Sequence, residues 1–158
     1  MEQCIYRTRI FVYSMGMGEN LMGQVFTDIT LKNVKDIFRA EEGTIKEDEI
    51  RHTSISILVD TGAGTLVITE AMQQELGLKT RLGQSVRMAN NASINIQEAD
   101  PVEVHWKNRK MICCPWVVPG AQKALLGLIP LEAMDLMVNP CSQEVVGVHG
   151  DEQIGILY

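Results

Sequence analysis

Residues 55–68 constrain the fold of this chain more than any other segment, because they place one acidic side chain between two apolar runs. The first run ends at Val59, the sequence Asp60-Thr61-Gly62-Ala63-Gly64 follows, and the chain then becomes apolar again. This pattern predicts a buried strand, a tight turn and a second buried strand, with the carboxylate of Asp60 at the turn. Since an isolated charge is costly to bury, this carboxylate must be hydrogen-bonded, ion-paired or protonated.

The turn offers groups that can stabilise the carboxylate of Asp60. They are the hydroxyl of Thr61 and the backbone amides of Gly62 and Ala63. Asp, Thr and Gly are also common in turns that have no chemical role. The segment alone is therefore equally consistent with an ordinary strand–turn–strand unit.

Length and charge limit the class of protein. A chain of 158 residues, of which 46% are hydrophobic, can bury the core of one domain, and its 13 glycines suit a turn-rich β fold. The net charge is −6, and no cluster of Lys and Arg stands out. We therefore expect neither nucleic acid nor a membrane surface as a partner.

The cysteines and the first residues bear on the compartment. No cysteine pair has the C-x-x-C spacing and no His lies at metal-ligand spacing, so we expect free thiols, no metal and a cytoplasmic protein. The apolar patch at residues 10–17 is too short for a convincing signal sequence and far too short to span a membrane. The cysteines are Cys4, Cys113, Cys114 and Cys141.

Hydrophobic periodicity divides the chain into an arm, a domain and a tail. We expect residues 1–22 to be an arm that is possibly disordered, residues 23–148 to be the domain, and residues 149–158 to be a C-terminal tail. Alternating apolar residues predict a strand from Val25 to Asn33. A charged insert with a surface helix follows at residues 34–50, and a short helix is predicted at residues 70–76, capped by Thr69 and ended by Gly77.

Two β-hairpins are predicted in the middle of the chain. The first covers residues 85–96, with its tip at Asn90 and Asn91, because Asn tolerates a positive φ. The second covers residues 102–118, with a turn at 107–110. Trp106 and Trp116 in this hairpin are expected to pack within the sheet.

The last part of the domain adds a short apolar strand at residues 124–129, which contains Gly127. Pro130 is expected to open a short helix that runs to Met134, and two more strands follow at residues 136–138 and 145–148. The chain thus contains about ten short strands and no βαβ alternation, which is typical of an all-β fold with a closed or partly closed barrel.

Three features occur in an order that resembles a known family. They are Asp60-Thr61-Gly62-Ala63, the polar-tipped hairpin near residue 90, and Leu125-Leu126-Gly127 followed by a short helix. This order is similar to that of the retropepsin-like (clan AA) aspartic proteases, in particular their stand-alone prokaryotic branch. The resemblance covers residues 23–148 and implies the acid-protease fold, with no cofactor.

The resemblance also implies roles for individual residues. Asp60 would be the catalytic acid, Thr61, Gly62 and Ala63 would shape the active-site loop, and Leu126 and Gly127 would support it from below. The first hairpin would be a flap that closes over an extended peptide. Its flap and substrate-binding residues would be Met88, Ala89, Asn90, Asn91, Ala92 and Ile94. From residue type alone we expect an apolar cleft formed by Val86, Met88, Ile94, Leu126 and the region of Ile68.

The chain has one Asp-Thr-Gly sequence, whereas peptide hydrolysis by carboxylates needs two carboxyl groups that share a proton. None of the other Asp residues is followed by Thr-Gly or Ser-Gly. The second carboxyl must then come from another copy, so the mechanism predicts a homodimer that acts on a peptide or protein substrate.

The Asp-Thr-Gly segment also allows other interpretations. Phosphate-binding loops of actin-like sugar kinases also contain an Asp with two glycines, but they need two α/β domains, for which this chain has no room. A catalytically silent dimerisation or peptide-binding module would keep the same Asp60, and the sequence leaves this alternative open. Gly64 and the glycine-free tip at Asn90-Asn91 depart from the viral pattern, so we expect a more flexible loop and a different opening of the flap.

Overall fold

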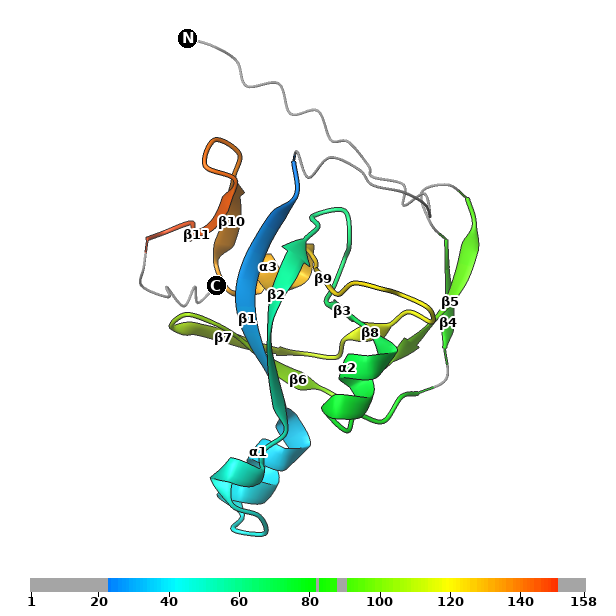
Figure 1. The fold of residues 1–158 in the computed structure, drawn as a ribbon, viewed down its shortest axis with the longest axis vertical. Coiled ribbons are helices and arrows are strands. Elements are labelled where there is room, and N and C mark those ends of the chain that lie inside the picture. The colour runs from blue at the N-terminus through cyan, green and yellow to red at the C-terminus, as the bar shows by residue number, and fades with distance from the viewer. Residues whose placement is uncertain (1–22, 82, 88–90, 151–158) are drawn as a thin grey trace, which may run out of the picture.

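Two long antiparallel strands form the spine of the molecule (Figure 1). Strand β1, Val25–Asn33, pairs along its length with β2, His52–Val59, from Val25 opposite Val59 to Lys32 opposite His52. The computed structural model describes residues 23–81, 83–87 and 91–150, and the structural statements below concern these residues. The strand predicted from Val25 to Asn33 is confirmed.

Nine strands form one sheet in the order β4-β5-β8-β3-β9-β2-β1-β6-β7. The order leaves β4 and β7 as edges, so the barrel is partly closed, and the predicted mainly β fold is confirmed. Strands β10, Leu136–Asn139, and β11, Glu144–Gly147, form a separate hairpin. The other strands are β3 Val67–Ile68, β4 Gln84–Arg87, β5 Ser93–Glu98, β6 Val102–Trp106, β7 Arg109–Cys113, β8 Trp116–Val117 and β9 Leu125–Leu126.

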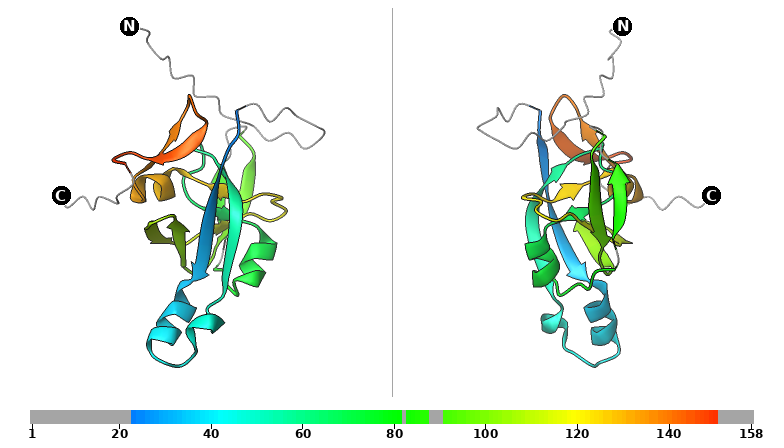
Figure 2. Two further views of the ribbon diagram at one scale, coloured as in Figure 1. Left: turned by 60° about the vertical axis from the view of Figure 1, so that its left-hand side comes forward. Right: turned by 90° about the vertical axis from the view of Figure 1, so that its right-hand side faces the viewer.

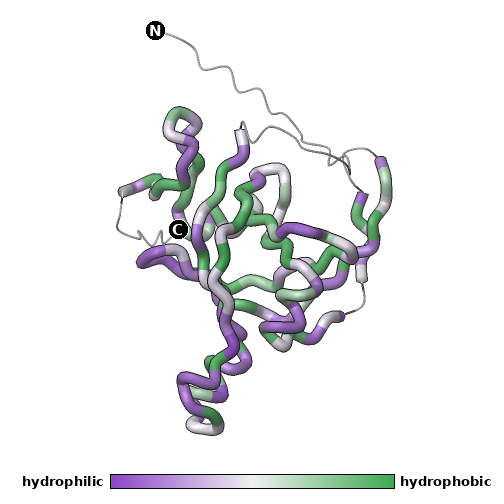
Figure 3. Tube along the Cα trace, in the orientation of Figure 1, coloured by the Kyte–Doolittle hydropathy of each residue, from purple (hydrophilic) through white to green (hydrophobic). Residues whose placement is uncertain are grey.

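The core lies inside the barrel, where alternate residues of each strand meet. Hydrophobic segments gather in the strands, and hydrophilic segments cover most of the α1 region (Figure 3). Ile29 and Leu31 of β1 are almost completely buried, whereas Asp28, which precedes Ile29, is exposed. The fully buried apolar side chains include Leu31, Leu66, Ile68, Leu76, Val102, Val104, Leu126 and Met134.

The predicted insert forms helix α1, Val34–Glu41, and a 3₁₀ turn η1, Glu47–Glu49. Both lie at the end of the spine opposite to the β10–β11 hairpin (Figures 1 and 2). Asn33 connects this insert to the barrel, because its side-chain oxygen accepts from the amides of Lys35 (2.9 Å) and Asp36 (3.3 Å). Its amide group donates to the carbonyl oxygen of Leu76 at 2.8 Å.

An ion pair between the buried carboxylate of Asp36 and the partly exposed Arg51 closes the base of the insert. The Arg51 guanidinium donates to both carboxylate oxygens of Asp36, with Nε–Oδ2 at 2.6 Å and a second bond to Oδ1 at 2.8 Å. The side chain of Asp36 is 2% exposed. The hydrogen bonds from Arg51 hold the pKa of Asp36 below its usual value, against the opposing effect of burial.

Helix α2, Glu70–Glu75, confirms the predicted capped helix. The Thr69 hydroxyl accepts from the amide of Met72 at 3.2 Å, which satisfies one of the unpaired amides of the first turn. Gly77 follows the helix with a φ of +62°, the left-handed conformation that glycine adopts without strain.

The second hairpin differs from its prediction at both ends. Its turn is Lys107-Asn108, shorter than the expected 107–110, so Arg109 belongs to β7. The returning strand stops at Cys113, and the chain then forms β8 in another part of the sheet. Pro115 lies at this break, since a proline has no amide to continue the ladder.

Arg109 is a buried cation, although the sequence predicted it to lie in the turn of the second hairpin. Its side chain is completely buried and donates to the carbonyl oxygen of Met134 (2.9 Å) and the carboxylate of Asp135 (3.2 Å). It also donates to the carbonyl oxygens of Asp135 and Gly150. Arg109 therefore ties β7 to the segment that leads into β10.

Helix α3, Leu128–Ala133, begins earlier than predicted. Pro130 was expected at the first helical position but is the third. A proline fits there because the amides of the first turn have no partner within the helix. The predicted strand at residues 124–129 is correspondingly shorter, since β9 contains only Leu125 and Leu126.

Replacing Asn33 by Ala should remove the α1 cap and leave the buried carbonyl of Leu76 without its donor. We expect Asn33→Ala to lower the free energy of unfolding by about 2–4 kcal/mol. Thr69→Ala removes only a cap and should cost about 1 kcal/mol. Urea denaturation followed by circular dichroism measures both values, and equal losses would contradict the second role of Asn33.

The ion pair with Arg51 should make stability depend on pH. The usual pKa of the Asp side chain is 3.8, and it is lowered for Asp36 in the folded state. The carboxylate therefore stabilises the fold above about pH 4, and this contribution is lost as the pH falls through the lower folded-state pKa. Asp36→Asn should lower stability at neutral pH and weaken its pH dependence between about pH 2 and 5. Urea titrations over this range test it, and parallel curves for the two proteins would rule it out.

Candidate active site

Asp60 lies at the first position after β2, where the chain leaves the sheet. Its amide donates to the carbonyl oxygen of Leu126 in β9 at 3.0 Å, which continues the parallel pairing of β2 with β9. The amide of Gly62 donates to carboxylate oxygen Oδ1 of Asp60 at 2.9 Å. Asp60 is half-buried, so its carboxylate is held by the turn but remains accessible.

The other two groups that the sequence offered to the carboxylate are arranged differently. The amide of Ala63 donates to the main-chain oxygen of Asp60 at 3.0 Å and closes the turn. Thr61 is exposed in the single chain. The expectation that both amides of the turn stabilise the carboxylate is therefore wrong for Ala63, because closing a tight turn uses that amide.

Two glycines around this loop leave little room for a side chain. A Cβ atom on Gly62 would lie 3.1 Å from Oδ1 of Asp60, against the oxygen that its amide binds. A Cβ atom on Gly127 would lie 2.3 Å from the carbonyl oxygen of Thr65 and 2.6 Å from that of Ala63. Gly127 therefore lies directly beneath the loop, where backbone atoms leave no room for a side chain.

Helix α3 holds the same loop from below. The amide of Leu128 donates to the carbonyl oxygen of Ala63 at 2.8 Å, and that of Ile129 donates to Gly64 at 3.1 Å. The first amides of a helix have no partner within the helix, so these bonds satisfy both the helix and the loop. Gly64 is thus restrained through its carbonyl group, in contrast to the flexibility expected from its sequence.

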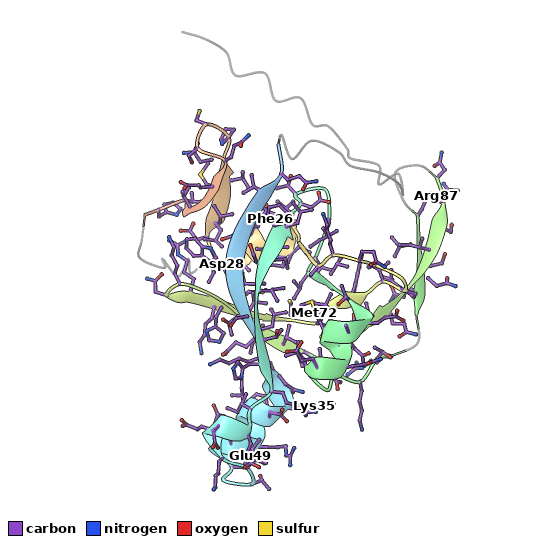
Figure 4. The ribbon with its side chains drawn as sticks, viewed as in Figure 1. Phe26, Asp28, Lys35, Glu49, Met72 and Arg87 are labelled. Carbon is purple, nitrogen blue, oxygen red and sulfur yellow. The ribbon has the colours of Figure 1, made fainter. Side chains whose placement is uncertain are left out.

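The predicted flap is a two-stranded hairpin, β4–β5, at one edge of the sheet (Figure 1). Val86 pairs with Ile94, and both are half-buried. Asn91 and Ala92 are exposed, and Asn91 has a φ of +63°. Figure 4 shows Arg87 at the far end of β4, pointing away from the barrel. Met88, Ala89 and Asn90 lie outside the described residues.

The expected composition of the cleft is wrong at two positions. Leu126 and Ile68 are completely buried in the core, so they cannot contact a substrate. Successive side chains of a strand point to opposite faces, and the neighbour Leu125 is half-buried. Leu125 is therefore the β9 side chain available outside the core, whereas Leu126 supports the loop through its backbone and through packing.

An open trough of about 450 Å³ lies elsewhere, on the outer face of β1, β2 and β6. Asp60 is not among its lining residues, so it is separate from the candidate active site. Sequence reasoning did not identify it, because its side chains come together only through strand pairing. Its lining residues are Asp28, Ile29, Thr30, Ser54, Ile55, Ser56, His105 and Lys107.

The comparison with protein families identifies the class of this site. The profile of the family described as gag-polyprotein putative aspartyl protease matches residues 47–133, which is more than half of the chain. The chain belongs to this family. It is therefore a retropepsin-like aspartic protease by family, a class of peptidase hydrolases, and the matched residues include the Asp60 loop, the β4–β5 hairpin and all of α3.

One solved structure agrees on the fold, and a second is a weaker match. The EIAV protease in complex with the inhibitor HBY-793 is 19% identical, with a TM-score of 0.51, over 73% of this chain and 92% of that protease. The retroviral protease-like domain of Ddi1 from Leishmania major is 12% identical, with a TM-score of 0.46, over 73% of this chain and 81% of that domain. Among curated proteins, no sequence matches this chain.

The cysteines, the potential metal ligands and the hydropathy of the helices also bear on function. Cys113, Cys114 and Cys141 are free, and burial raises the pKa of Cys113 to about 12. In the described residues, no three or more His, Cys, Asp or Glu side chains are placed to hold a metal ion. Over the same part of the chain, no helix has the length and hydropathy needed to cross a membrane.

The contact between Gly127 and the loop can be tested with a matched pair of variants. Gly127→Ala should lower the free energy of unfolding by about 2–3 kcal/mol, because the atoms that its Cβ would meet are backbone atoms. Gly64→Ala is the control, since nothing lies within 4 Å of its added Cβ, and it should change stability by less than about 0.5 kcal/mol. Urea denaturation measures both; similar losses would contradict the packing role of Gly127.

Proposed function

We propose that the chain is one half of an aspartic endopeptidase, in which Asp60 and Asp60 of the partner subunit form the catalytic pair of a homodimer. The observation that carries the proposal is the loop of a single Asp-Thr-Gly sequence, fixed between β9 and α3 so that one accessible carboxylate lies at its centre. The chain belongs to an aspartyl protease family, which supports a catalytic role for this carboxylate. One carboxylate in each chain makes the second copy necessary.

The two carboxyl groups would have different tasks. Two carboxylates in contact cannot both be ionised, because the charges repel, so one carries a proton. The ionised group takes a proton from a water molecule, which then attacks the peptide carbonyl carbon. The protonated group donates its proton to the carbonyl oxygen as the tetrahedral intermediate forms, and the leaving amine is then protonated by the pair.

The hydrogen bonding of Asp60 suits the roles of acid and base that the two carboxyl groups would have. Oxygen Oδ1 accepts from the amide of Gly62, so this oxygen is oriented by the turn. Within the described residues Oδ2 has no hydrogen-bond donor, which leaves it for the water or for the carboxyl group of the partner subunit. Thr61, exposed beside Asp60 in the single chain, is a second group that we expect the partner to cover.

We further propose that the substrate is an extended peptide with apolar side chains near the cleaved bond. Val86 and Ile94 form a half-buried apolar pair on the hairpin, and Leu125 offers a third apolar side chain next to the loop. The hairpin would act as a flap, with Asn91 and Ala92 near its tip. An extended peptide suits such a site, because its alternate side chains point to opposite faces.

We propose that residues 23–148 are the catalytic domain, with residues 34–50 as an insert and residues 1–22 and 149–158 as flanking segments. The insert projects from the end of the spine away from the β10–β11 hairpin, which supports its separation from the chemistry (Figure 1). The free cysteines of the described residues are in keeping with a cytoplasmic setting.

The test compares wild type, Asp60→Asn and Asp28→Asn on an unbiased peptide library from acidic to neutral pH. Asp60→Asn should reduce cleavage by a factor of at least about 10²–10⁴, because the substitution removes both carboxyl groups of the pair, the base and the acid. Asp28 is exposed on β1 outside the loop, so Asp28→Asn should cleave like wild type.

Each other outcome has a distinct meaning. Cleavage that persists in Asp60→Asn would refute the catalytic assignment. A dimeric wild type that cleaves no peptide at any pH would favour the alternative, a catalytically silent dimerisation or peptide-binding module.

A further inference from the structure

Helix α3 depends on the rest of the fold for its position. It has six residues, whereas isolated helices of fewer than about 12 residues are only marginally stable in water. Leu131 and Met134 are buried and pack the helix against the core, but apolar contacts of this kind are not directional. The hydrogen bonds at the two ends of α3 therefore supply the direction that its packing lacks.

The N-terminal end of α3 is bonded to the loop that carries Asp60. The amides of its first two residues, Leu128 and Ile129, donate to carbonyl oxygens of this loop at 2.8 and 3.1 Å. A shift of α3 along its axis would move these carbonyl groups with it. The placement of the Asp60 carboxylate consequently depends on what holds the other end of the helix.

The C-terminal end of α3 is held by Arg109 of β7. One nitrogen of its guanidinium, Nη1, donates to the carbonyl oxygen of Met134, which caps the helix, at 2.9 Å, and to the carboxylate of Asp135 at 3.2 Å. The last carbonyl groups of a helix have no partner within the helix, and its dipole favours positive charge there. Helix α3 thus lies between the β10–β11 hairpin and β7 (Figure 2, left view), with a cation at its end.

The guanidinium of Arg109 is also fixed on its other side. Its second nitrogen, Nη2, donates to the carbonyl oxygen of Gly150, which follows β11. A Cβ atom on Gly147 would collide with Nη2, so glycine at this position leaves the space that the guanidinium occupies. The Arg109 side chain is completely buried. A planar group whose donors point in fixed directions, held between two segments, can determine where the end of α3 lies.

We infer that Arg109 is a positioning residue for the proposed reaction, because through α3 it fixes the loop that presents the carboxylate of Asp60. This inference rests on the proposed aspartic endopeptidase activity and adds to it a residue of β7. A buried ion pair is a weak source of net stability, since desolvation cancels much of the attraction, so the guanidinium contributes direction more than strength. A displacement of about 1 Å near the reacting groups can lower a rate about 10²-fold, so a small shift of α3 is sufficient.

The test compares two variants of Arg109 with a control at the other end of the spine. Arg109→Met keeps an unbranched side chain but removes every donor, and Arg109→Lys keeps the charge without the planar fork. Arg51→Met is the control, because it also removes a guanidinium bonded to a carboxylate, that of Asp36, but at the insert. Circular dichroism and urea denaturation of the full chain verify that each variant is folded under the assay conditions.

The first readout is peptide cleavage by the folded variants. We expect Arg109→Met to lower kcat about 10–100-fold and to leave KM within about 3-fold of wild type, because a displaced carboxylate weakens the transition state more than peptide binding. Arg109→Lys should have an intermediate kcat. Arg51→Met should keep kcat within about 2-fold of wild type, since distant sites act independently.

The second readout, hydrogen exchange followed by NMR, does not require catalysis. The amides of Leu128 and Ile129 should exchange at least about 10-fold faster in Arg109→Met than in Arg51→Met. The rates are compared with those of the β1 amides, which report on unfolding of the barrel. A loss of stability alone would accelerate both sets of amides together.

The remaining outcomes separate this inference from the proposed activity. Arg109→Met with the kcat and the exchange rates of Arg51→Met would overturn the inference. If Arg109→Met does not fold, Arg109→Lys decides, because wild-type kcat and exchange in that variant would reject a role for the planar fork. Cleavage by the wild type that does not depend on Asp60 would refute the proposed endopeptidase, and unchanged exchange at Leu128 and Ile129 would then reject the link between Arg109 and the loop as well.

Discussion

The active-site loop can be held in place because residue 127 has no side chain. The backbone of Gly127 approaches the carbonyl oxygens of Ala63 and Thr65 more closely than a Cβ would allow. This approach brings the first amides of α3 within hydrogen-bonding distance of the loop. The carboxylate of Asp60 therefore owes its position to a contact between segments more than sixty residues apart in the sequence.

The two ends of the β1–β2 spine serve different purposes. At one end β2 leads into the Asp60 loop, and the exposed apolar side chains of Leu128 and Ile129 lie on the helix that holds this loop. At the other end Asn33, Asp36 and Arg51 anchor a charged helical insert through buried polar contacts. Such contacts are strong when all partners are present, and costly when one is removed. The spine thus separates the loop that carries Asp60 from the charged insert.

Local patterns predicted much of this fold. The turn at Asp60, the cap at Thr69, the stop at Gly77 and the hairpin that pairs Val86 with Ile94 all depend on neighbouring residues, and each is present. Errors arose where the cause lies far away in the sequence. The break at Pro115 and the early start of α3 depend on which strand or loop is adjacent, and the burial of Arg109 depends on carbonyl groups near residue 135. No local periodicity contains that information.

The sequence by itself determined a mainly β fold and a single Asp-Thr-Gly turn between apolar strands. It did so because hydrophobic alternation, turn chemistry and the number of acidic motifs are properties of short segments. Only the tertiary structure decided which side chains face the core, that Leu126 supports the loop from inside while Leu125 lies outside, and that Leu128 and Ile129 are exposed beside Asp60. Burial is a property of the packed chain, since it depends on strands and helices that meet only after folding.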